Sequence, residues 1–276
     1  MTLRLIVNAD DYGRTAEISR GIREAHTRGI VTSTTCMMNY PTTEADIAAA
    51  LAETPRLGLG VHLVLTSGCP LTPPAEIPSL TNAQGGFLSL DQFTARLAQI
   101  DPAEAQKEWR AQIEKFIRAA GRTPTHLDSH HHSSYFSEGL FRAMLELAAE
   151  YDCAIRYATY LTPSGTMDGL PPESVQAARE YAPRLMTAFK PRTTDAFFAS
   201  FYDERATLEE FQRIVRSLPA SGTFEVMCHP GYADAALIAG SVYARQRETE
   251  LDVLTSQAVR AVLAERGVEL VSFAAV

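Results

Sequence analysis

The repeated alternation of strand-length runs with helix-length segments is the feature that most constrains this fold. Runs of strand length occupy residues 3–7, 30–37, 57–65, 125–130, 154–157, 223–230 and 268–273. Strands separated by helices pair in parallel, because a parallel connection needs a crossover. About seven such strands predict an α/β fold with helices outside a mainly parallel sheet, most simply a distorted (β/α) TIM-like barrel, closed or incomplete. A doubly wound sheet is the alternative, but no glycine-rich nucleotide-binding loop follows a predicted strand.

Helices are predicted between these strands, over 44–53, 102–120, 138–151, 208–218 and 251–266 and around Ile18, Ile22 and Ala25. The helix at 102–120 has the clearest boundaries, because Asp101 and Pro102 are start signals and Gly121 is a stop signal. Trp109 on this helix is expected to be packed. The proline-containing stretches 66–90 and 160–205 are not readable as regular structure. The absence of an internal repeat or a linker predicts one domain over residues 1–276.

Composition and charge exclude several classes of partner. The 276 residues carry a formal net charge of −8, which disfavours a nucleic-acid partner because phosphates would be repelled. No apolar run approaches the length of a membrane span, and the first ten residues become polar too early for a signal peptide. The four cysteines are scattered without a CxxC pair, so they are expected to be reduced and mostly buried. A cytoplasmic location is therefore expected.

Chemically capable residues recur where predicted strands end. Asp10 and Asp11 follow the first strand, and His62, His130 and His229 lie near the ends of three others. The carboxyl ends of barrel strands share one face, so these side chains are expected to converge. The alternative for the Asp pair is helix N-capping, and for His62 it is a hydrogen-bonded core position. As chain neighbours, Asp10 and Asp11 are expected to project in different directions.

Four of the seven histidines fall within residues 125–132. If 125–130 is a strand, its period of two places His126, Asp128 and His130 on one face. Imidazoles and a carboxylate together are ligands that suit a divalent cation. A solvated histidine-rich loop is the alternative.

Two imidazoles and one carboxylate would leave coordination positions open on a shared ion, as catalytic sites require. If Asp11, His62 and His130 bind one ion, that ion could activate water and polarise a carbonyl. Asp10 could then accept a proton, and His229 could protonate a leaving group. This arrangement is typical of amide or ester hydrolysis, and no GxSxG nucleophile motif is present.

Four blocks of the chain resemble the YdjC-like carbohydrate deacetylases. They are Asn8–Gly13, Gly60–Leu63, Thr125–His132 and Glu225–Pro230, and similarity extends from about residue 4 to the C-terminus. The resemblance implies a distorted (β/α) barrel that removes an N-acetyl group from N-acetylglucosamine-containing sugars. It assigns Asp11, His62 and His130 as metal ligands, Asp10 as base and His229 as acid. It also implies magnesium, with zinc as the alternative that imidazole ligands favour, and a homodimer.

Other roles and functions stay open at this level. His126, Asp128 and His132 are candidates to orient ligands, or are structural hydrogen-bonding residues. Arg156 could bind substrate, but a surface ion pair is the preferred interpretation. The alternatives to a chitooligosaccharide deacetylase are a deacetylase of another amino sugar or glycolipid head group, and a barrel that binds sugar or metal without turnover.

Overall fold

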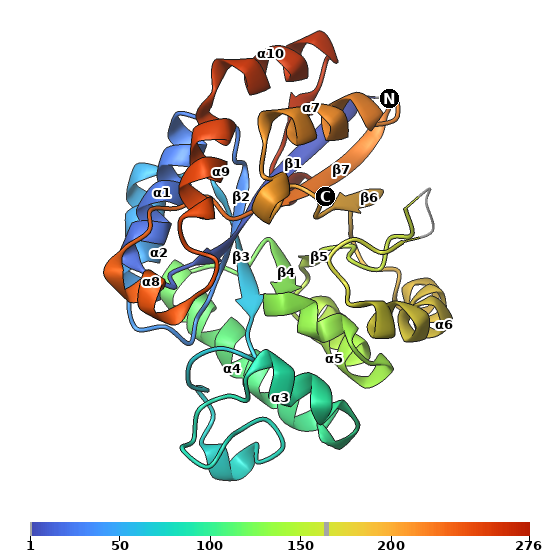
Figure 1. Cartoon of the computed structure of the whole chain (residues 1–276). Helices are drawn as coiled ribbons and strands as arrows, with labels where there is room; N and C mark the ends of the chain where they lie inside the picture. Colours follow the sequence, from blue (N-terminus) through green and yellow to red (C-terminus); the bar gives the residue numbers. More distant parts are fainter. Residues whose placement is uncertain (1, 163–165) are drawn as a thin grey trace.

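The computed structural model describes residues 2–162 and 166–276 and contains one curled, parallel β-sheet (Figure 1). Its strands are β1 (Leu3–Tyr12), β2 (Ser33–Cys36), β3 (Gly58–Leu63), β4 (His126–Ser129), β5 (Ala154–Ile155), β6 (Ala196–Phe198), β7 (Gly222–Cys228) and β8 (Glu269–Leu270). They are ordered β5-β4-β3-β2-β1-β7-β6, and β8 pairs with β1. Every strand pair is parallel.

The two edges of the sheet approach each other without full closure. Ile155 of the edge strand β5 forms an isolated parallel bridge with Thr193, just before the other edge strand, β6. The Ile155 amide donates a hydrogen bond of 2.9 Å to the Arg192 carbonyl, and the Thr193 hydroxyl donates one of 2.9 Å to the Ile155 carbonyl. The prediction of a distorted α/β barrel is therefore confirmed.

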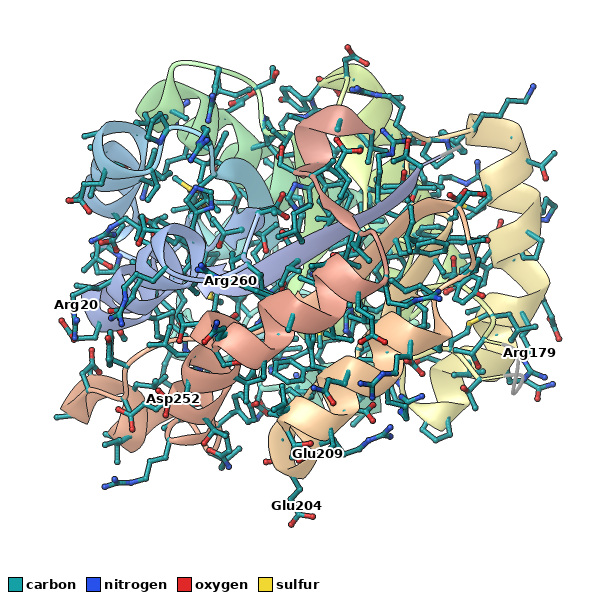
Figure 2. The ribbon with its side chains drawn as sticks, turned by 90° about the horizontal axis from the view of Figure 1, so that it is seen from above. Arg20, Arg179, Glu204, Glu209, Asp252 and Arg260 are labelled. Atoms are coloured by element: carbon teal, nitrogen blue, oxygen red, sulfur yellow. The ribbon has the colours of Figure 1, made fainter. Side chains whose placement is uncertain are left out.

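Helices cover the outside of the sheet. They are α1 (Ala16–Thr27), α2 (Thr43–Glu53), α3 (Leu90–Ala95), α4 (Pro102–Ala120), α5 (Glu138–Glu150), α6 (Pro172–Phe189), α7 (Leu208–Ser217), α8 (Ala235–Gly240), α9 (Gln246–Thr255) and α10 (Gln257–Glu265). Charged side chains such as Arg20, Glu209 and Asp252 point away from the sheet (Figure 2). No helix in the two described ranges is long and apolar enough to cross a membrane.

Helix α4 confirms its predicted boundaries. The Asp101 carboxylate accepts a hydrogen bond of 2.8 Å from the Ala103 amide, and Gly121 ends the helix with a φ of 67°. Trp109 is fully buried, as expected. The glutamate Glu108, also buried, accepts hydrogen bonds from two amides of the 66–90 loop and so fixes that loop to α4.

The predicted single helix at 251–266 is wrong, because the chain breaks into α9 and α10. Ser256 has an extended backbone, and its hydroxyl accepts a hydrogen bond of 3.3 Å from the Val259 amide, so it caps a new helix. The unreadable stretch 160–205 contains α6 and β6, while residues 163–165 lie outside the described part. Phe197 and Phe201 in that stretch are buried and fill core.

The inner face of the sheet changes character along the barrel. Ile6 packs with Ala154 and Phe273 in a small apolar cluster. Side chains alternate along β1, so Asn8 and Asp10 share the face of Ile6 and lie nearer the carboxyl ends of the strands. The Phe273 ring also stacks on His126, with centroids 3.8 Å apart. An apolar base therefore supports a polar interior, which leads to the candidate site.

Candidate metal and catalytic site

Asp10 and Asp11 both line one cavity, although they are neighbours on a strand. The pairing of β1 with β2 shifts register between Ala9 and Tyr12, and Asp11 has a φ of 69°. Such a bulge turns the extra residue out of the strand's alternation, and Asp tolerates positive φ better than most residues. Both carboxylates therefore reach the same cavity, as predicted, and they contact different partners there: Asp10 pairs with Arg156, whereas Asp11 lies next to His62 and His130.

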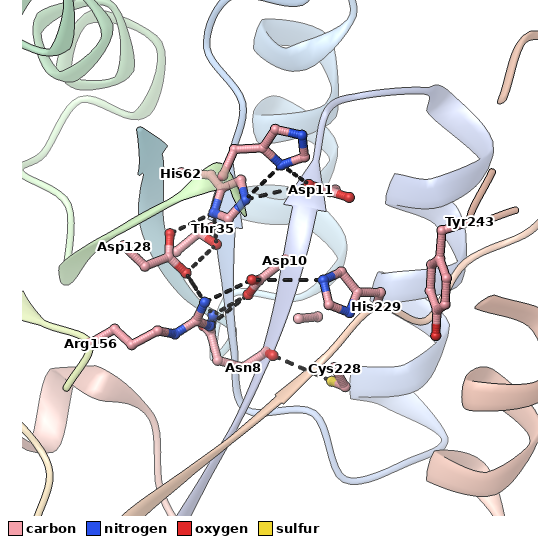
Figure 3. Close-up of polar contacts among 12 residues, drawn as sticks. Asn8, Asp10, Asp11, Thr35, His62, Asp128, Arg156, Cys228, His229 and Tyr243 are labelled. Carbon is pink, nitrogen blue, oxygen red and sulfur yellow. Dashed lines mark hydrogen bonds and ion pairs between the residues drawn. The ribbon is translucent and has the colours of Figure 1, made fainter. Parts of the chain in front are cut away.

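Asp11, His62 and His130 bring three donor atoms together (Figure 3). Asp11 Oδ1 lies 3.4 Å from His62 Nε2 and 3.2 Å from His130 Nδ1, and the two nitrogens are 3.3 Å apart. Donors bonded at about 2.0–2.2 Å to one tetrahedral ion lie about 3.4 Å from one another. The spacing therefore fits a single divalent ion.

Hydrogen bonding leaves one oxygen of this trio without a donor. The Asp128 carboxylate lies 2.7 Å from His62 Nδ1, so Nδ1 carries the proton and the lone pair of Nε2 faces the other two donors. A proton shared by the two imidazoles would satisfy both rings. Asp11 Oδ1 would still be buried without a hydrogen bond from any described residue. The residues present therefore fit a cation.

Arg156 pairs with Asp10 inside the barrel. Its Nη1 and Nη2 donate to the two oxygens of Asp10 at 2.7 and 2.6 Å, and its Nε donates to Glu225 at 2.8 Å. Nη1 also lies 3.0 Å from Asp128. Arg156 has no exposed surface, so the predicted surface ion pair is wrong. Burial alone would raise the pKa of Asp10, but the Arg156 guanidinium holds that pKa well below its usual range.

Buried negative charge exceeds buried positive charge here. Five buried carboxylates (Asp10, Asp11, Asp128, Glu225 and Glu250) face two buried guanidinium groups, those of Arg156 and Arg247. Full ionisation would leave an excess of three negative charges in a region of low dielectric. Burial reduces this excess, because it raises the pKa of Glu225 to about 8 and that of Glu250 to about 7. A divalent cation would offset the negative charge that remains.

His229 follows β7 and lies beside Asp10. Its Nε2 is 3.9 Å from Asp10 Oδ2, its Nδ1 is 3.8 Å from Glu250 Oε1, and its backbone amide donates to Glu250. Only 12% of its side chain is exposed. Burial lowers the pKa of His229 to about 4, although the Asp10 carboxylate favours the charged ring. The imidazole is therefore neutral at rest, and it lies next to the Asp10 carboxylate without a direct hydrogen bond to it.

The other histidines of the cluster have different positions. β4 ends at Ser129, so His130 lies in the following 3-10 turn, although it still reaches the cavity. His126 bonds Asn8 at 3.0 Å and contacts no proposed ligand. His132 lines the cavity, but its buried Nδ1 has no hydrogen-bond partner in the described chain. His131, which the sequence did not distinguish, lies 2.9 Å from the Thr66 hydroxyl.

Of the three candidates to orient ligands, only Asp128 contacts one. Thr35 supports it with a hydrogen bond of 3.0 Å to the second Asp128 oxygen. Arg247 is a further contact that the sequence did not reveal, and it donates to Asp11 Oδ2. Glu225 could have been found, because the period of two places it on the face of His229. Arg247 and Glu250 lie on a helix distant in sequence and gave no such signal.

The cavity around these residues encloses about 830 Å³. Small-molecule sites usually have about 300–1,000 Å³. Its walls also include Thr66 and Leu90 from the 66–90 loop, and Gly169 and Leu170 from the 160–205 stretch. Both stretches that the sequence left unread therefore shape the space available to a ligand.

Comparisons with known proteins identify the family. The model of the family described as "YdjC-like protein" matches residues 4–265. The chain is 37% identical to a carbohydrate deacetylase of Brevibacillus brevis, covering 98% of each chain, and 39% identical to one of Geobacillus stearothermophilus, covering 97% and 96%. It is 38% identical to a chitooligosaccharide deacetylase of Salmonella paratyphi B, covering 98% and 97%.

Solved structures agree with the sequence comparisons. A crystal structure from Enterococcus faecalis V583, described there only provisionally as a cellobiose-phosphate cleavage protein, superposes with a TM-score of 0.86. It is 31% identical, with 100% and 99% of the two chains covered. A carbohydrate esterase domain of a xylanase from the hindgut metagenome of Trinervitermes trinervoides shares the fold alone, with a TM-score of 0.51, 5% identity and coverage of 99% and 88%. The chain belongs to the YdjC-like family.

Proposed function

We propose that this protein is a metal-dependent carbohydrate N-deacetylase that releases acetate from N-acetylglucosamine-containing oligosaccharides such as diacetylated chitobiose. That it is a carbohydrate deacetylase, and so a hydrolase of a carbon–nitrogen bond, rests on family membership and on near full-length identity to carbohydrate and chitooligosaccharide deacetylases. The observation that carries the finer proposal is the convergence of three donor atoms with Asp10 and His229 in one cavity.

Asp11 Oδ1, His62 Nε2 and His130 Nδ1 are the atoms that would hold the ion. When bound, a divalent ion would polarise the acetamide carbonyl and make water more acidic. The family resemblance implies magnesium, whereas two nitrogen donors favour zinc among divalent metals. Asp128 fixes the orientation of His62 through its contact with Nδ1, and Arg247 fixes that of Asp11 through its hydrogen bond to Oδ2.

Asp10 and His229 supply the proton transfers of the reaction. Asp10 Oδ2 accepts a proton from the water as the water oxygen bonds to the acetamide carbon. His229 Nε2, 3.9 Å from that oxygen, takes this proton from Asp10 and passes it to the nitrogen as the carbon–nitrogen bond breaks, so that both groups return to their starting states. One proton thus moves from water to the amine, and the products are acetate and a free amino sugar. Arg156 holds Asp10 through both oxygens and so prevents it from turning away.

Acetate and amine release test this proposal. Chelator-treated protein is supplied with magnesium or zinc and diacetylated chitobiose, and acetate and free amine are measured separately. The proposal predicts equal amounts of both products and their loss in Asp10→Asn and His229→Ala. Acetate without amine would indicate an esterase, and no product with any metal would overturn the assignment to this sugar.

Two alternatives remain as outcomes of a wider substrate panel. Release only from another amino sugar or a glycolipid head group would keep the chemistry and change the substrate. Sugar binding without turnover would indicate a non-catalytic barrel, although pure binding does not require the Asp10–His229 pair. We also propose that residues 1–276 form one domain and that the protein is cytoplasmic. We further propose that it forms a homodimer, which light scattering can test.

A further inference from the structure

We propose that Tyr202 and Tyr243 form an aromatic platform that holds a sugar ring next to the ring being deacetylated. This inference rests on the proposed carbohydrate substrate. Both tyrosines line the cavity that contains the metal donors. Their rings are stacked, with centroids 4.3 Å apart and planes inclined by 14°. The two stacked rings therefore form part of the wall of the candidate site.

Tyr243 is rigidly held. Its hydroxyl donates to the buried Glu250 carboxylate and accepts a hydrogen bond of 3.1 Å from the Asp203 amide. Only 7% of Tyr243 is exposed. A ring fixed in this way gives its partner, Tyr202, a defined orientation before any ligand arrives, which lowers the entropy cost of binding.

Tyr202 is the more accessible ring of the pair, and it lines the cavity. It is 41% exposed, although it is a large aromatic side chain. A single exposed tyrosine on a loop would need no explanation. This ring differs because its stacking partner is anchored and because it lines the candidate site. The apolar face of an aromatic ring suits the C–H face of a sugar ring.

The platform lies beside the proposed proton donor. The His229 ring meets Tyr202 and Tyr243 edge to face, at centroid distances of 5.3 and 5.7 Å. Figure 3 shows His229 between Asp10 and Tyr243. When the acetamide nitrogen faces His229, the sugar that carries this nitrogen, which is the leaving group, extends toward the two tyrosines. The platform thus contacts the next ring of an oligosaccharide, which a monosaccharide lacks.

Substitution of Tyr202 tests this inference with two sugars. Tyr202→Ala is expected to raise KM for diacetylated chitobiose about tenfold, the order of one lost stacking contact, with kcat little changed. KM or Kd for N-acetylglucosamine is expected to change less than twofold. Tyr202→Phe keeps the ring and should behave as wild type. Tyr232→Ala is the matched control, because this half-buried tyrosine packs under Arg20 outside the cavity.

A direct binding measurement separates this inference from the proposed function. Diacetylated chitobiose is titrated calorimetrically into metal-loaded Asp10→Asn protein and into the Asp10→Asn, Tyr202→Ala double variant. Thermal unfolding confirms that each variant is folded. Wild-type acetate release with Tyr202-independent affinity would overturn the platform alone. Tyr202-dependent binding without acetate release would overturn the proposed reaction alone. Equal losses for the one-ring and two-ring sugars would also overturn the platform, since they would place Tyr202 at the acetamide ring.

Discussion

At the scale of single residues, the candidate site is organised by one guanidinium among three carboxylates. Arg156 contacts Asp10, Asp128 and Glu225, and all four side chains are buried. Removal of one partner from a buried ion pair leaves an uncompensated buried charge. The free energy lost in this way exceeds the net stabilisation that the intact pair provides. Arg156 therefore affects both stability and the position of Asp10.

Replacement of Arg156 separates these two effects. Arg156→Ala is expected to lower the free energy of unfolding by about 3–5 kcal/mol, because Asp10 and Asp128 lose the buried positive charge that both contact. Arg156→Lys keeps the charge but not the paired contact with Asp10, so it should fold and lose most activity. Urea unfolding and acetate release measure the two effects. Full activity in Arg156→Lys would show that Asp10 needs no such support.

Glu225 makes a pH-dependent contribution to stability. Burial raises its pKa to about 8, despite Arg156, and its Oε2 has no hydrogen-bond partner among described residues. A carboxyl whose folded pKa exceeds its unfolded value of about 4.3 stabilises the fold at low pH, and this contribution is lost as pH rises through 8. Unfolding of chelator-treated protein between pH 5 and 8 should show a slope of up to about 1.4 kcal/mol per pH unit from this group. Glu225→Gln should remove that slope, and an unchanged slope would contradict the assignment.

At the scale of elements, strand packing depends on the absence of one side chain. A Cβ on Gly60 of β3 would lie 2.6 Å from the His126 ring and from the His126 carbonyl oxygen. Stacking of the His126 ring on Phe273 opposes movement of the ring away from such a Cβ. The glycine therefore permits β3 and β4 to place His62 and Asp128 in contact.

Gly60→Ala is expected to lower the free energy of unfolding by about 1–3 kcal/mol through overpacking. Gly240→Ala is the matched control, because a Cβ there meets nothing within 4 Å and no positive φ is required. Thermal unfolding compares the two variants. Equal stability of both would show that the strands can separate at no cost.

Sequence patterns predicted elements well where local signals decide structure. α4 was predicted closely because Asp101, Pro102 and Gly121 act within their own helix. α6 was missed because Pro171 and Pro172 resemble loop residues, although proline is favourable at a helix start. The break at Ser256 was missed because helical spacing continues across it. The bulge at Asp11 depends on pairing between β1 and β2, which no local pattern contains.

At the scale of the whole molecule, the barrel topology explains why the site could be anticipated in part. Asp10, Asp11, His62, His130 and His229 were predicted to converge because parallel strands end on one face, and the structure brings them together. Arg156, Glu250 and Arg247 could not be paired with them, because those contacts depend on the three-dimensional path of the chain after β5 and β7. The catalytic and metal roles stay predictions.

Ion binding should stabilise the whole chain if the donors are brought together only by folding. An ion at 100 times its Kd adds about 2.7 kcal/mol to the free energy of unfolding. For a chain of this size that corresponds to a rise in Tm of about 5–10 °C. His130→Ala should lose most of this rise, whereas His26→Ala, remote from the cavity, should retain it. Equal shifts in both variants would place the ion elsewhere.

The proposed dependence of deacetylation on a bound metal ion is tested most directly by measuring bound metal and acetate release on the same samples. Zinc or magnesium is added stepwise to chelator-treated protein, and bound ion per chain is compared with the rate of acetate release from diacetylated chitobiose. We expect activity to rise in proportion to the bound ion and to be complete at one ion per chain, and we expect His130→Ala to lose both. Full activity in chelator-treated protein without bound ion, or in His130→Ala, would contradict this dependence.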